Sequence, residues 1–376
     1  MKKKIIYVVN DIDFFISHRL HLAIAAKKIF NEVYVCSSFN LRKIRYLERK
    51  GIKFLKLDID RSNTTLFKEI RILLSLYSIV KRIKPDVLQL ITIKPLVYGS
   101  IVSLITKPKL TVYNFSGLGH IHHSKDKYLL KRIIIFILRN TIKKTKSVIF
   151  LQNKSDFQYL KMQKVITNQK VIFTKGSGVN LNKFKPSKKI NKEKIVLLAS
   201  RMSKDKGVME FISVSQKIFH IDKKIKFILA GSYDPDGPLP ISLKLLKSLN
   251  NNIEHPNIKW IGNVKNILNL IQKSKIVMLP SYHEGVPKIL LEAAACGKPI
   301  IASNISGCRE VVENNKNGYL INKAKINEMS KALLKILNNQ DLANKMKKFS
   351  RKKALKEFSI QKVIDLHINQ YKKIFK

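Results

Sequence analysis

Two glutamates in one short segment have the spacing and the surroundings of a ligand site. Glu284 follows an apolar run at 276–279, which is typical of a buried strand, and Glu292 lies further along in a helix-like stretch. A helix that begins just after Gly285 places both carboxylates on roughly the same face. Its first backbone N–H groups, near Val286, form an anion site. Two carboxylates beside an anion site predict a ligand with both phosphate and hydroxyl groups, such as a sugar nucleotide.

A pair of cations follows another predicted strand. Arg201 comes directly after the apolar run at 195–199, and Lys206 lies on the same loop. Two cations above the ends of parallel strands suit a diphosphate. An ordinary solvated loop would also carry Lys206, because the chain is rich in lysine. Composition explains Arg201 less easily, because the chain uses lysine so heavily in place of arginine.

The elements that position these residues alternate between strand and helix along the whole chain. The predicted strands are 5–9, 33–36, 53–57, 87–91, 110–113, 147–151 and 171–173, then 195–199, 226–230, 258–261, 276–279 and 300–302. This order predicts an α/β protein with two doubly wound, Rossmann-like parallel sheets. Their ligands are expected at the carboxyl ends of the strands, in a cleft between the two domains.

Loop and linker chemistry divides the chain into two domains. Glycines at 176 and 178 and a lysine-rich stretch at 183–192 interrupt the pattern. We therefore expect one domain at 1–182 and a second at 183–358, with a last helix at 359–376 crossing back to the first. Ser17 is a plausible N-cap for a helix that continues to Phe30. Another long helix is expected over 326–356.

The charge of the chain is extreme. Its 376 residues include 73 Lys and Arg against 25 Asp and Glu, a net charge of +48. Compositional drift toward lysine, attraction to an anionic membrane and nucleic-acid binding each account for such a charge. No nucleic-acid-binding motif accompanies it, so we expect no nucleic-acid partner. The three cysteines lack disulfide or metal spacing, the first apolar run is too short for a signal peptide, and no run is long enough to span a membrane. A cytoplasmic location is expected.

Together, these segments resemble glycosyltransferase family 4. The C-terminal motifs are Ala199-Ser200-Arg201, Lys206-Gly207-Val208 and Ser281-Tyr282-His283-Glu284-Gly285-Val286-Pro287 with Glu292. The N-terminal motifs Phe15 to Leu20, Thr92-Ile93-Lys94-Pro95, Ser116 to Gly119 and Gly176 to Asn180 are similar to those of bacterial transferases that build surface polysaccharides and lipid-linked glycans. Among these are N-acetylgalactosaminyl- and galactosyltransferases. The resemblance implies a GT-B fold and retaining transfer from a sugar nucleotide.

The resemblance also implies roles for particular residues. Arg201 and Lys206 match the pair that binds the donor diphosphate and stabilises its charge on departure. Glu284 matches an acid near the donor sugar, and Glu292 one that accepts hydrogen bonds from the ribose. The segment of Gly285, Val286 and Pro287 lies where members contact sugar and phosphate, although Pro287 has no N–H. Asn263 and Val264 fall where members contact the base, which is most often uracil.

The acceptor side is expected in the N-terminal domain, at His18, Lys94, Ser116, Gly117 and His120. Many family members place a histidine after the fifth strand, where this chain has Asn114 to Gly117. A retaining transferase can pass the acceptor proton to the departing phosphate. The lack of this histidine is therefore consistent with an active transferase. The first loop, 10–17, lacks the glycine-rich segment of many members. The contacts that those members make there are therefore not assigned to residues of this chain.

The sequence therefore predicts a transferase that moves a hexose or N-acetylhexosamine from a UDP-sugar to a polyprenyl-diphosphate-linked glycan. The basic apolar helix at 128–143 is either a core helix with a lysine-rich face or a docking element on the inner face of the cytoplasmic membrane. No metal or other cofactor is expected, because Asp234-Pro235-Asp236 has the character of a turn. Two alternatives remain: an enzyme similar to UDP-N-acetylglucosamine 2-epimerases, and a basic module that binds nucleic acid or an anionic surface.

Overall fold

The chain folds into two α/β units. The computed structural model describes residues 2–59, 65–118, 128–189, 191–235, 237, 239–250 and 256–376. One unit comprises Met1–Ser177 with Gln361–Lys376, and the other comprises Gly178–Ile360. The sequence pattern placed the divisions at 182/183 and 358/359 instead. Residues 178–182 belong with the second unit because Val179 pairs with Ser359 and the Leu181 carbonyl accepts a hydrogen bond from Arg351.

The N-terminal unit contains, among its described residues, a seven-stranded parallel sheet in the order β3-β2-β1-β4-β5-β6-β7. Its strands are β1 (Lys4–Val9), β2 (Glu32–Ser37), β3 (Lys53–Lys56), β4 (Val87–Ile91), β5 (Leu110–Asn114), β6 (Ser147–Leu151) and β7 (Lys170–Phe173). The central strands β4 and β5 are buried along their whole length, as expected for parallel strands covered on both faces. The order reverses between β1 and β4, which is where an open parallel sheet binds its ligands.

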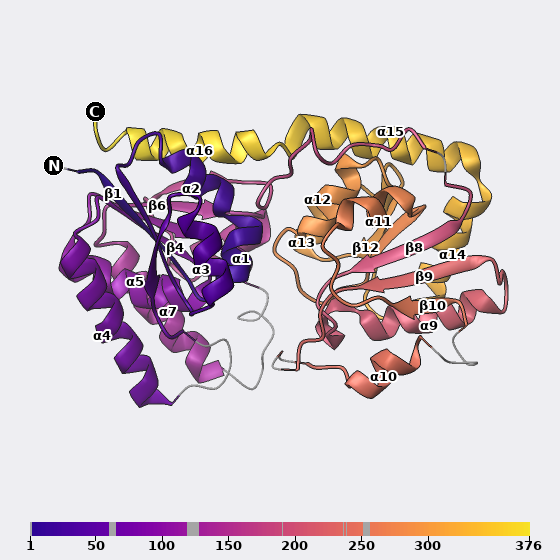
Figure 1. The fold of residues 1–376 in the computed structure, drawn as a ribbon, viewed down its shortest axis with the longest axis horizontal. Helices are drawn as coiled ribbons and strands as arrows, with labels where there is room; N and C mark the ends of the chain where they lie inside the picture. Colours follow the sequence, from indigo (N-terminus) through magenta and orange to yellow (C-terminus); the bar gives the residue numbers. More distant parts are fainter. Residues whose placement is uncertain are drawn as a thin grey trace. The chain divides into compact units, whose positions relative to one another are not determined.

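Helices cover both faces of this sheet (Figure 1). They are α1 (Ile12–His18), α2 (Leu20–Ala26), α3 (Leu41–Glu48), α4 (Leu66–Ile83), α5 (Ile93–Thr106), α7 (Tyr128–Ile142), α8 (Lys154–Met162) and α16 (Ile360–Lys372). Buried side chains of α4, α5, α7 and α8 share one hydrophobic core, and those of α1, α2, α3 and α16 share the other. The last helix, α16, thus packs on the N-terminal unit, although the residues that precede it in the sequence belong to the other unit.

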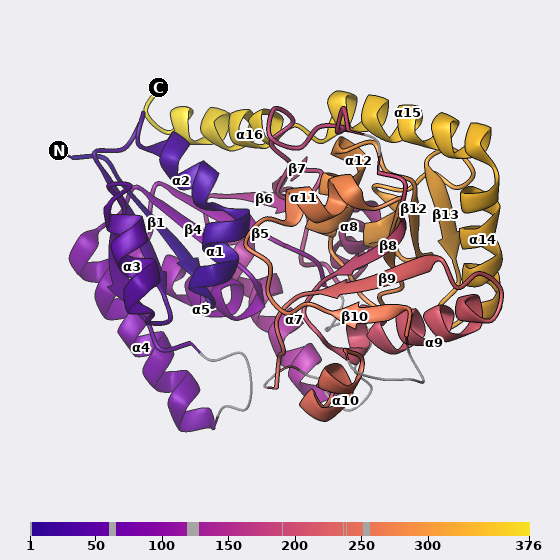
Figure 2. The same ribbon diagram turned by 45° about the vertical axis from the view of Figure 1, so that its right-hand side comes forward.

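The C-terminal unit repeats the design. Its described residues form a six-stranded parallel sheet in the order β10-β9-β8-β11-β12-β13 (Figure 2). The strands are β8 (Lys194–Ala199), β9 (Ile225–Ala230), β10 (Ile258–Trp260), β11 (Ile276–Leu279), β12 (Ile300–Ser303) and β13 (Gly318–Ile321). The flanking helices are α9 (Val208–Phe219), α10 (Leu243–Ser248), α11 (Ile267–Lys273), α12 (Lys288–Ala295), α13 (Ser306–Arg309), α14 (Ile326–Asn338) and α15 (Gln340–Glu357), with a 3-10 turn, η2 (Lys204–Lys206). The switch in strand order lies between β8 and β11.

The two predicted sheets are confirmed, whereas two predicted helices, Ser17 to Phe30 and 326–356, differ from the structure, in which α2 ends at Ala26. The first helix begins at Ile12, because the Asp11 carboxylate caps it by accepting a hydrogen bond from the backbone N–H of Phe14 at 2.8 Å. It ends before Arg19, whose φ of −133° is not helical, so the predicted helix from Ser17 to Phe30 is two helices. The predicted helix at 326–356 is also two, because the side chain of Asn339 caps α15.

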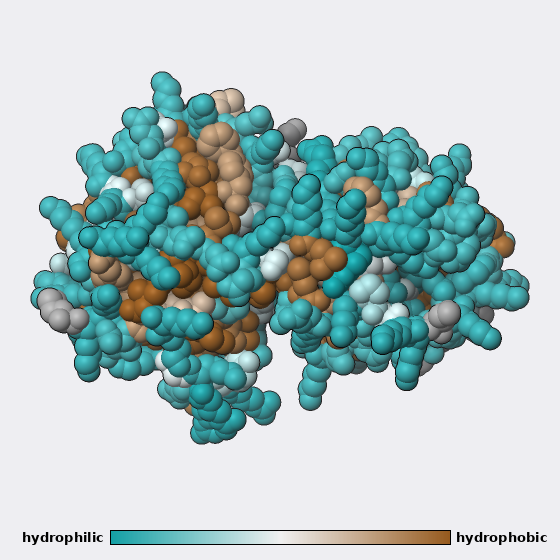
Figure 3. Space-filling model, turned by 90° about the horizontal axis from the view of Figure 1, so that it is seen from above, coloured by the Kyte–Doolittle hydropathy of each residue, from teal (hydrophilic) through white to brown (hydrophobic). Residues whose placement is uncertain are grey.

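The surface of the C-terminal unit reflects its lysine content. Seen from above in Figure 3, its visible face is mostly hydrophilic with a few hydrophobic patches, and hydrophobic side chains cover more of the N-terminal unit. No helix among the described residues is both long enough and apolar enough to cross a membrane.

Gly207, between η2 and α9, is a position where the local backbone geometry requires a glycine. Its φ is +73°, and a Cβ atom there would lie 2.2 Å from the carbonyl oxygen of Pro280. Gly262 has a similar φ of +66°, but a Cβ atom there would have nothing within 4 Å. We expect Gly262→Ala to lower the free energy of unfolding by roughly 1–2 kcal/mol, the cost of a left-handed alanine. Gly207→Ala is expected to cost about 1–3 kcal/mol more, because of the added clash. Urea unfolding of the two variants measures the difference, and equal losses would contradict the assigned close approach.

Candidate active site

The two predicted acids and two predicted cations of the C-terminal unit lie at the carboxyl edge of its sheet. Arg201 follows β8, and Glu284 follows β11, the neighbouring strand across the switch point. Three contacts bind the two loops together. The backbone N–H of Tyr282 donates to the Asp205 carbonyl at 2.8 Å, the Ser281 hydroxyl donates to the Lys206 carbonyl at 3.4 Å, and Gly207 lies directly against Pro280. Arg201, Lys206 and Glu284 are therefore carried by one rigid local assembly.

Lys206 and Glu284 form an ion pair in this assembly. The Lys206 Nζ and the Glu284 Oε1 atoms are 2.8 Å apart, and the side chains are only 15% and 14% exposed. A second carboxylate, that of Asp205, lies 3.9 Å from the same Nζ atom. At this depth an ion pair is screened much less than one on the surface. The sequence placed the two residues at one site, and the structure shows them in direct contact.

Arg201 pairs with Asp234, a residue that the sequence analysis assigned only to a turn. Asp236, the other acid of that turn, lies outside the described residues. The guanidinium is 36% exposed, so the pair faces solvent on one side. Both cations expected to hold a diphosphate are thus already engaged by carboxylates. Among the described residues, no group of three or more His, Cys, Asp or Glu side chains is arranged to hold a metal ion.

Glu292 is the most deeply buried acid of the set. Its residue is 4% exposed, and its carboxylate lies 3.3 Å from the Lys288 Nζ atom one turn earlier in α12. Burial raises the pKa of Glu292, and the charge and hydrogen bond of Lys288, with the charge of Lys183, act in the opposite direction. A buried carboxylate held by a lysine is a fixed hydrogen-bond acceptor, which suits hydroxyl groups on a ligand.

The backbone between the two glutamates is closely packed. A Cβ atom on Gly307, in α13, would lie 1.5 Å from the carbonyl oxygen of Gly285, so the start of α13 touches this loop. The Tyr282 hydroxyl donates to Glu210 at 2.5 Å, and this hydrogen bond, with burial, raises the pKa of Tyr282 to about 12. These contacts fix the path of the chain through Gly285 and Val286 into α12, which Pro287 precedes.

Asn263 and Val264 lie farther along the same edge. They follow β10, the edge strand, two positions from β8 in the sheet. Asn263 is exposed and Val264 is partly buried. The turn that precedes them is held where the Gly231 N–H donates to the Gly262 carbonyl at 2.7 Å and the Trp260 Nε1 atom donates to the Gly231 carbonyl at 3.0 Å. Both residues therefore share the edge that carries Arg201 and Glu284.

The predicted acceptor-side residues are dispersed over the N-terminal unit. His18 ends α1, where its ring stacks on Phe14 at a centroid distance of 4.3 Å. Lys94, in the first turn of α5, pairs with Glu69 of α4 at 3.1 Å. Ser116 and Gly117 follow β5, and His120 lies outside the described residues. The structure thus gives Lys94 a partner of its own and places Ser116 and Gly117 at a strand end.

Arg19 lies in the motif from Phe15 to Leu20, but the sequence did not single it out as a site residue. Its side chain is buried, with the residue 2% exposed, and its Nη2 atom donates to the Ser116 hydroxyl at 3.3 Å. In the described structure its Nε and Nη1 atoms have no hydrogen-bond partner. Burial lowers the pKa of Arg19 to about 10. Burying a guanidinium without a carboxylate partner costs free energy. The position of Arg19 next to Ser116 therefore supports a functional role for this strand end.

A histidine does lie at the end of β5, but it comes from α16. The Asn114 Oδ1 atom is 3.1 Å from the Nε2 atom of His367, whose ring stacks on Phe150 at 3.8 Å. Burial lowers the pKa of His367 to about 3, so the ring is neutral at physiological pH. The residue is far from β5 in sequence, and no local pattern points to it.

Thr92, at the end of β4, has a strained backbone. Its φ of 72° and ψ of 161° lie in a region that is essentially restricted to glycine. Its hydroxyl donates to the Asn10 side chain at 2.9 Å, which joins the ends of β1 and β4 at the switch point. Strain of this kind, at the edge where an open sheet binds ligands, supports the assignment of a functional site to this unit.

Comparison with known proteins agrees with this division of the chain. Residues 180–353 match the model "Glycosyl transferases group 1", and residues 4–153 match "Glycosyl transferase 4-like". The chain belongs to the glycosyltransferases. Because both halves match transferase domains, the group-transfer hypothesis is confirmed over the epimerase and binding-module alternatives. The predicted likeness to family 4 is confirmed as well.

Relatives of this glycosyltransferase cover most of its length. It is 26% identical, over 87% of each chain, to the N,N'-diacetylbacillosaminyl-diphospho-undecaprenol alpha-1,3-N-acetylgalactosaminyltransferase of Campylobacter jejuni. It is 27% identical to the UDP-Gal:alpha-D-GlcNAc-diphosphoundecaprenol alpha-1,3-galactosyltransferase of Escherichia coli, over 81% of this chain and 79% of the relative. A solved structure of Anabaena Alr3699/HepE in complex with UDP and glucose has a TM-score of 0.78 at 17% identity, over 99% of this glycosyltransferase and 100% of that chain. This last likeness confirms the GT-B fold.

Proposed function

We propose that this glycosyltransferase moves a hexose or N-acetylhexosamine from a UDP-sugar to a glycan on a polyprenyl diphosphate, in the assembly of a surface polysaccharide or glycoconjugate. The observation that carries the proposal is the cluster of Arg201, Lys206 and Glu284 at the carboxyl edge of β8 and β11. The two relatives named for undecaprenyl-diphosphate-linked acceptors support the acceptor class. The neighbour solved with UDP supports the nucleotide.

In this proposal the donor diphosphate binds between Arg201 and Lys206. Each cation now contacts a carboxylate, Asp234 or Glu284 respectively, and the diphosphate replaces these contacts with charge-assisted hydrogen bonds to its own oxygens. Glu284, released from Lys206, accepts a hydrogen bond from the donor sugar. Glu292 accepts hydrogen bonds from the ribose, for which its fixed, buried carboxylate is suited. Asn263 and Val264, farther along the same edge, contact the base.

The reaction breaks the bond between the anomeric carbon and the diphosphate oxygen. An acceptor hydroxyl attacks the anomeric carbon from the face that the diphosphate leaves, so the configuration is retained. The proton of that hydroxyl passes to the departing phosphate oxygen, and the products are UDP and the extended glycan. Arg201 and Lys206 stabilise the charge that develops on the leaving group. We propose that these two cations do this without a metal ion.

The N-terminal unit is proposed to hold the acceptor. Ser116 and Gly117 follow β5 beside buried Arg19, while Thr92 and Lys94 follow β4. These strand ends lie next to one another in the sheet, on the β4 side of its switch point. Among the residues predicted for this role, Ser116 and Gly117 are the best supported by their position.

A membrane surface is the proposed second partner of the N-terminal unit. Helices α4 and α7 both pack against α5 and expose large apolar side chains. These side chains, each 46–78% exposed, are Leu66, Phe67, Ile70 and Leu74 of α4 and Leu129, Leu130, Ile133 and Phe136 of α7. Basic residues such as Arg132 and Arg139 lie among them. Apolar side chains beside cations suit an anionic leaflet, where a polyprenyl-linked acceptor resides. We therefore propose a cytoplasmic enzyme bound peripherally to the inner face of the membrane.

The proposed donor site makes a direct prediction about transfer. Arg201→Ala is expected to lower kcat by about 100-fold or more, the usual effect of losing one group that stabilises a departing charge. Glu284→Gln is expected to lower kcat to a similar extent, because it removes the charged acceptor that holds the donor sugar in place. The matched control is Lys226→Ala, which breaks an exposed Lys–Glu pair with Glu193 in the same unit, at 2.5 Å, and should leave transfer unchanged.

The assay measures UDP release and the lipid-linked product from a panel of UDP-sugars with undecaprenyl-diphosphate-linked acceptors, with circular dichroism to confirm folding. Near-normal turnover in both site variants would refute the assignment.

The same assay with a chelator tests the proposal that transfer needs no metal ion. Full activity is expected, and a loss of activity that a divalent ion restores would contradict the proposal.

The proposed membrane surface predicts a specific loss of vesicle binding. Ile133→Gln with Phe136→Gln is expected to weaken co-sedimentation with phosphatidylglycerol vesicles, because each change removes apolar area from the bilayer interface. The matched control, Ile221→Gln with Leu239→Gln, removes two similarly exposed apolar side chains from the C-terminal unit and should have no effect. Equal binding by both double variants would exclude α7 as the docking element.

A further inference from the structure

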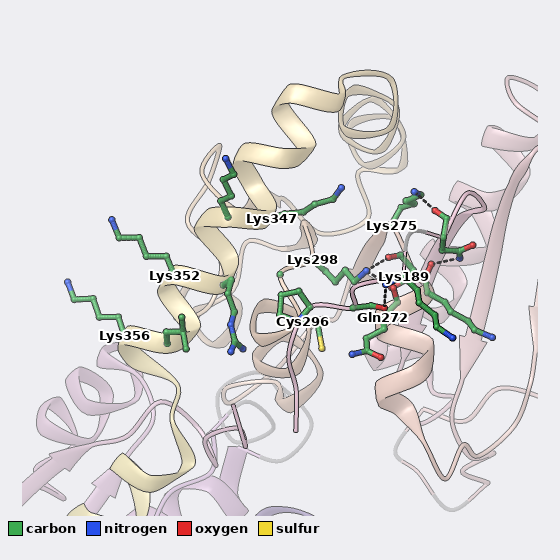
Figure 4. Close-up of a pocket in the computed structure, with 17 residues that line it drawn as sticks. Lys189, Gln272, Lys275, Cys296, Lys298, Lys347, Lys352 and Lys356 are labelled. Atoms are coloured by element: carbon green, nitrogen blue, oxygen red, sulfur yellow. Dashed lines mark hydrogen bonds between the residues drawn. The ribbon is translucent and has the colours of Figure 1, made fainter. Parts of the chain in front are cut away.

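The C-terminal unit contains a second basic site, at the edge of its sheet opposite the proposed donor site. A cavity of about 880 Å³ is lined by residues that precede β8, β11 and β12, by the end of α12 and by one face of α15 (Figure 4). These strands are parallel neighbours, so their amino ends share one edge. Arg201 and Glu284 follow the carboxyl ends of β8 and β11. The cavity and the donor site are therefore separated by the length of the strands.

The lining is far more basic than the chain as a whole. Nine of its 17 residues are Lys or Arg, and none of these described lining residues is Asp or Glu. In the full sequence 73 of 376 residues are Lys or Arg, which is about one in five. If compositional drift toward lysine were the only cause, acidic and basic residues would line the cavity in the ratio found in the whole chain. It would not concentrate basic residues on one concave surface.

Three lysines form the inner part of the cavity. Lys298 Nζ donates to the carbonyls of Gln272 at 2.8 Å and Ser274 at 2.7 Å, and Lys275 Nζ donates to the carbonyl of Asn191 at 2.6 Å. The Lys347 Nζ atom donates to the Asn344 side chain at 3.3 Å.

The acceptors of these three lysines are neutral oxygens, so the hydrogen bonds hold the ammonium groups in place without compensating their charge. An ammonium group has three N–H donors, so each lysine retains at least one for a ligand.

The three charges repel one another. Burial, together with the charges of Lys347 and Lys275, lowers the pKa of Lys298 to about 8, and Cys296 acts in the opposite direction. Burial also lowers the pKa of Lys347, as does the charge of Lys275. An anion among them would relieve this repulsion and repay part of the cost of desolvation.

The rim of the cavity adds flexible cations and an apolar surface. Lys352 and Lys356 extend along α15, and in Figure 4 their ammonium groups point away from the inner lysines. Such long side chains reorient at little cost when an anion approaches. Leu355, 51% exposed, and Pro186 provide apolar contact area beside them.

We propose that this cavity is a binding site for a phosphate-bearing anion, held by Lys275, Lys298 and Lys347 and distinct from the donor site. Phosphate fits because it offers several acceptor oxygens and more than one negative charge to a small set of ammonium donors. The same group occurs on a phospholipid headgroup and on a soluble phosphorylated metabolite, and both would be recognised by these contacts. The inference does not depend on the proposed transfer reaction.

The test follows the acetylation of individual lysines in the full chain by peptide mass spectrometry. Pyrophosphate and phosphatidylglycerol vesicles are the two probes, and phosphatidylcholine vesicles are the control for non-specific coverage. A bound anion is expected to slow acetylation of Lys298 and Lys347 several-fold while Lys331 and Lys345, exposed on α14 and α15, react at an unchanged rate. Protection by pyrophosphate alone identifies a soluble ligand, and protection by phosphatidylglycerol alone identifies a lipid headgroup. Protection by neither probe, or equal protection of all four lysines, would overturn the proposal.

Charge-neutral variants give a second, independent measurement. Lys275→Gln with Lys347→Gln is expected to raise the pyrophosphate concentration that half-protects Lys298 by about tenfold or more, the usual effect of losing a charge-assisted hydrogen bond. The matched control, Lys331→Gln with Lys345→Gln, removes the same charge from the same unit and should leave that concentration unchanged. The same shift in both double variants would show that net charge alone attracts the anion, and would also overturn the site.

Discussion

The proposed chemistry depends on two ion pairs at one sheet edge. Lys206 with Glu284, and Arg201 with Asp234, hold opposite charges together where β8 and β11 end. Side chains this long would otherwise sample many rotamers, and ordering them only when the donor arrives would cost binding energy. The pairs keep both cations near the edge, and the diphosphate needs only to exchange one set of anionic partners for another.

The position of these pairs follows from the topology of the sheet. In an open parallel sheet the loops on either side of the switch point diverge, which leaves room for a ligand at the carboxyl edge. Gly207 allows the Lys206 turn to lie against Pro280, and Gly307 allows α13 to lie against Gly285. The amino edge of the same sheet carries the lysine cavity, where cations face one another without carboxylates. One sheet therefore presents two kinds of basic site, one compensated by acids and one not.

Sequence reasoning predicted what depends on local pattern and missed what depends on distant contacts. Buried parallel strands have continuous apolar runs, so both sheets were predictable, and so was the placement of Arg201 and Glu284 at strand ends. Asp234 appeared to be only a turn residue, because its contact with Arg201 crosses from β9 to β8. His367 reaches the end of β5 from the last helix, which no periodicity of the sequence indicates. Arg19 belongs to the motif from Phe15 to Leu20, but its burial beside Ser116 depends on a contact between residues far apart in the sequence.

The proposed exchange of Asp234 for the diphosphate at Arg201 changes the affinity for UDP. Calorimetric titration of UDP into wild type, Asp234→Asn, Arg201→Ala and the double variant measures it directly. If Asp234 only occupies Arg201 until the diphosphate arrives, Asp234→Asn should tighten UDP binding by about tenfold, a gain near 1.4 kcal/mol. That gain should vanish in the Arg201→Ala background, because the two residues act as a coupled pair. Weaker binding of UDP to Asp234→Asn would contradict the exchange and would make Asp234 a positioning residue for Arg201.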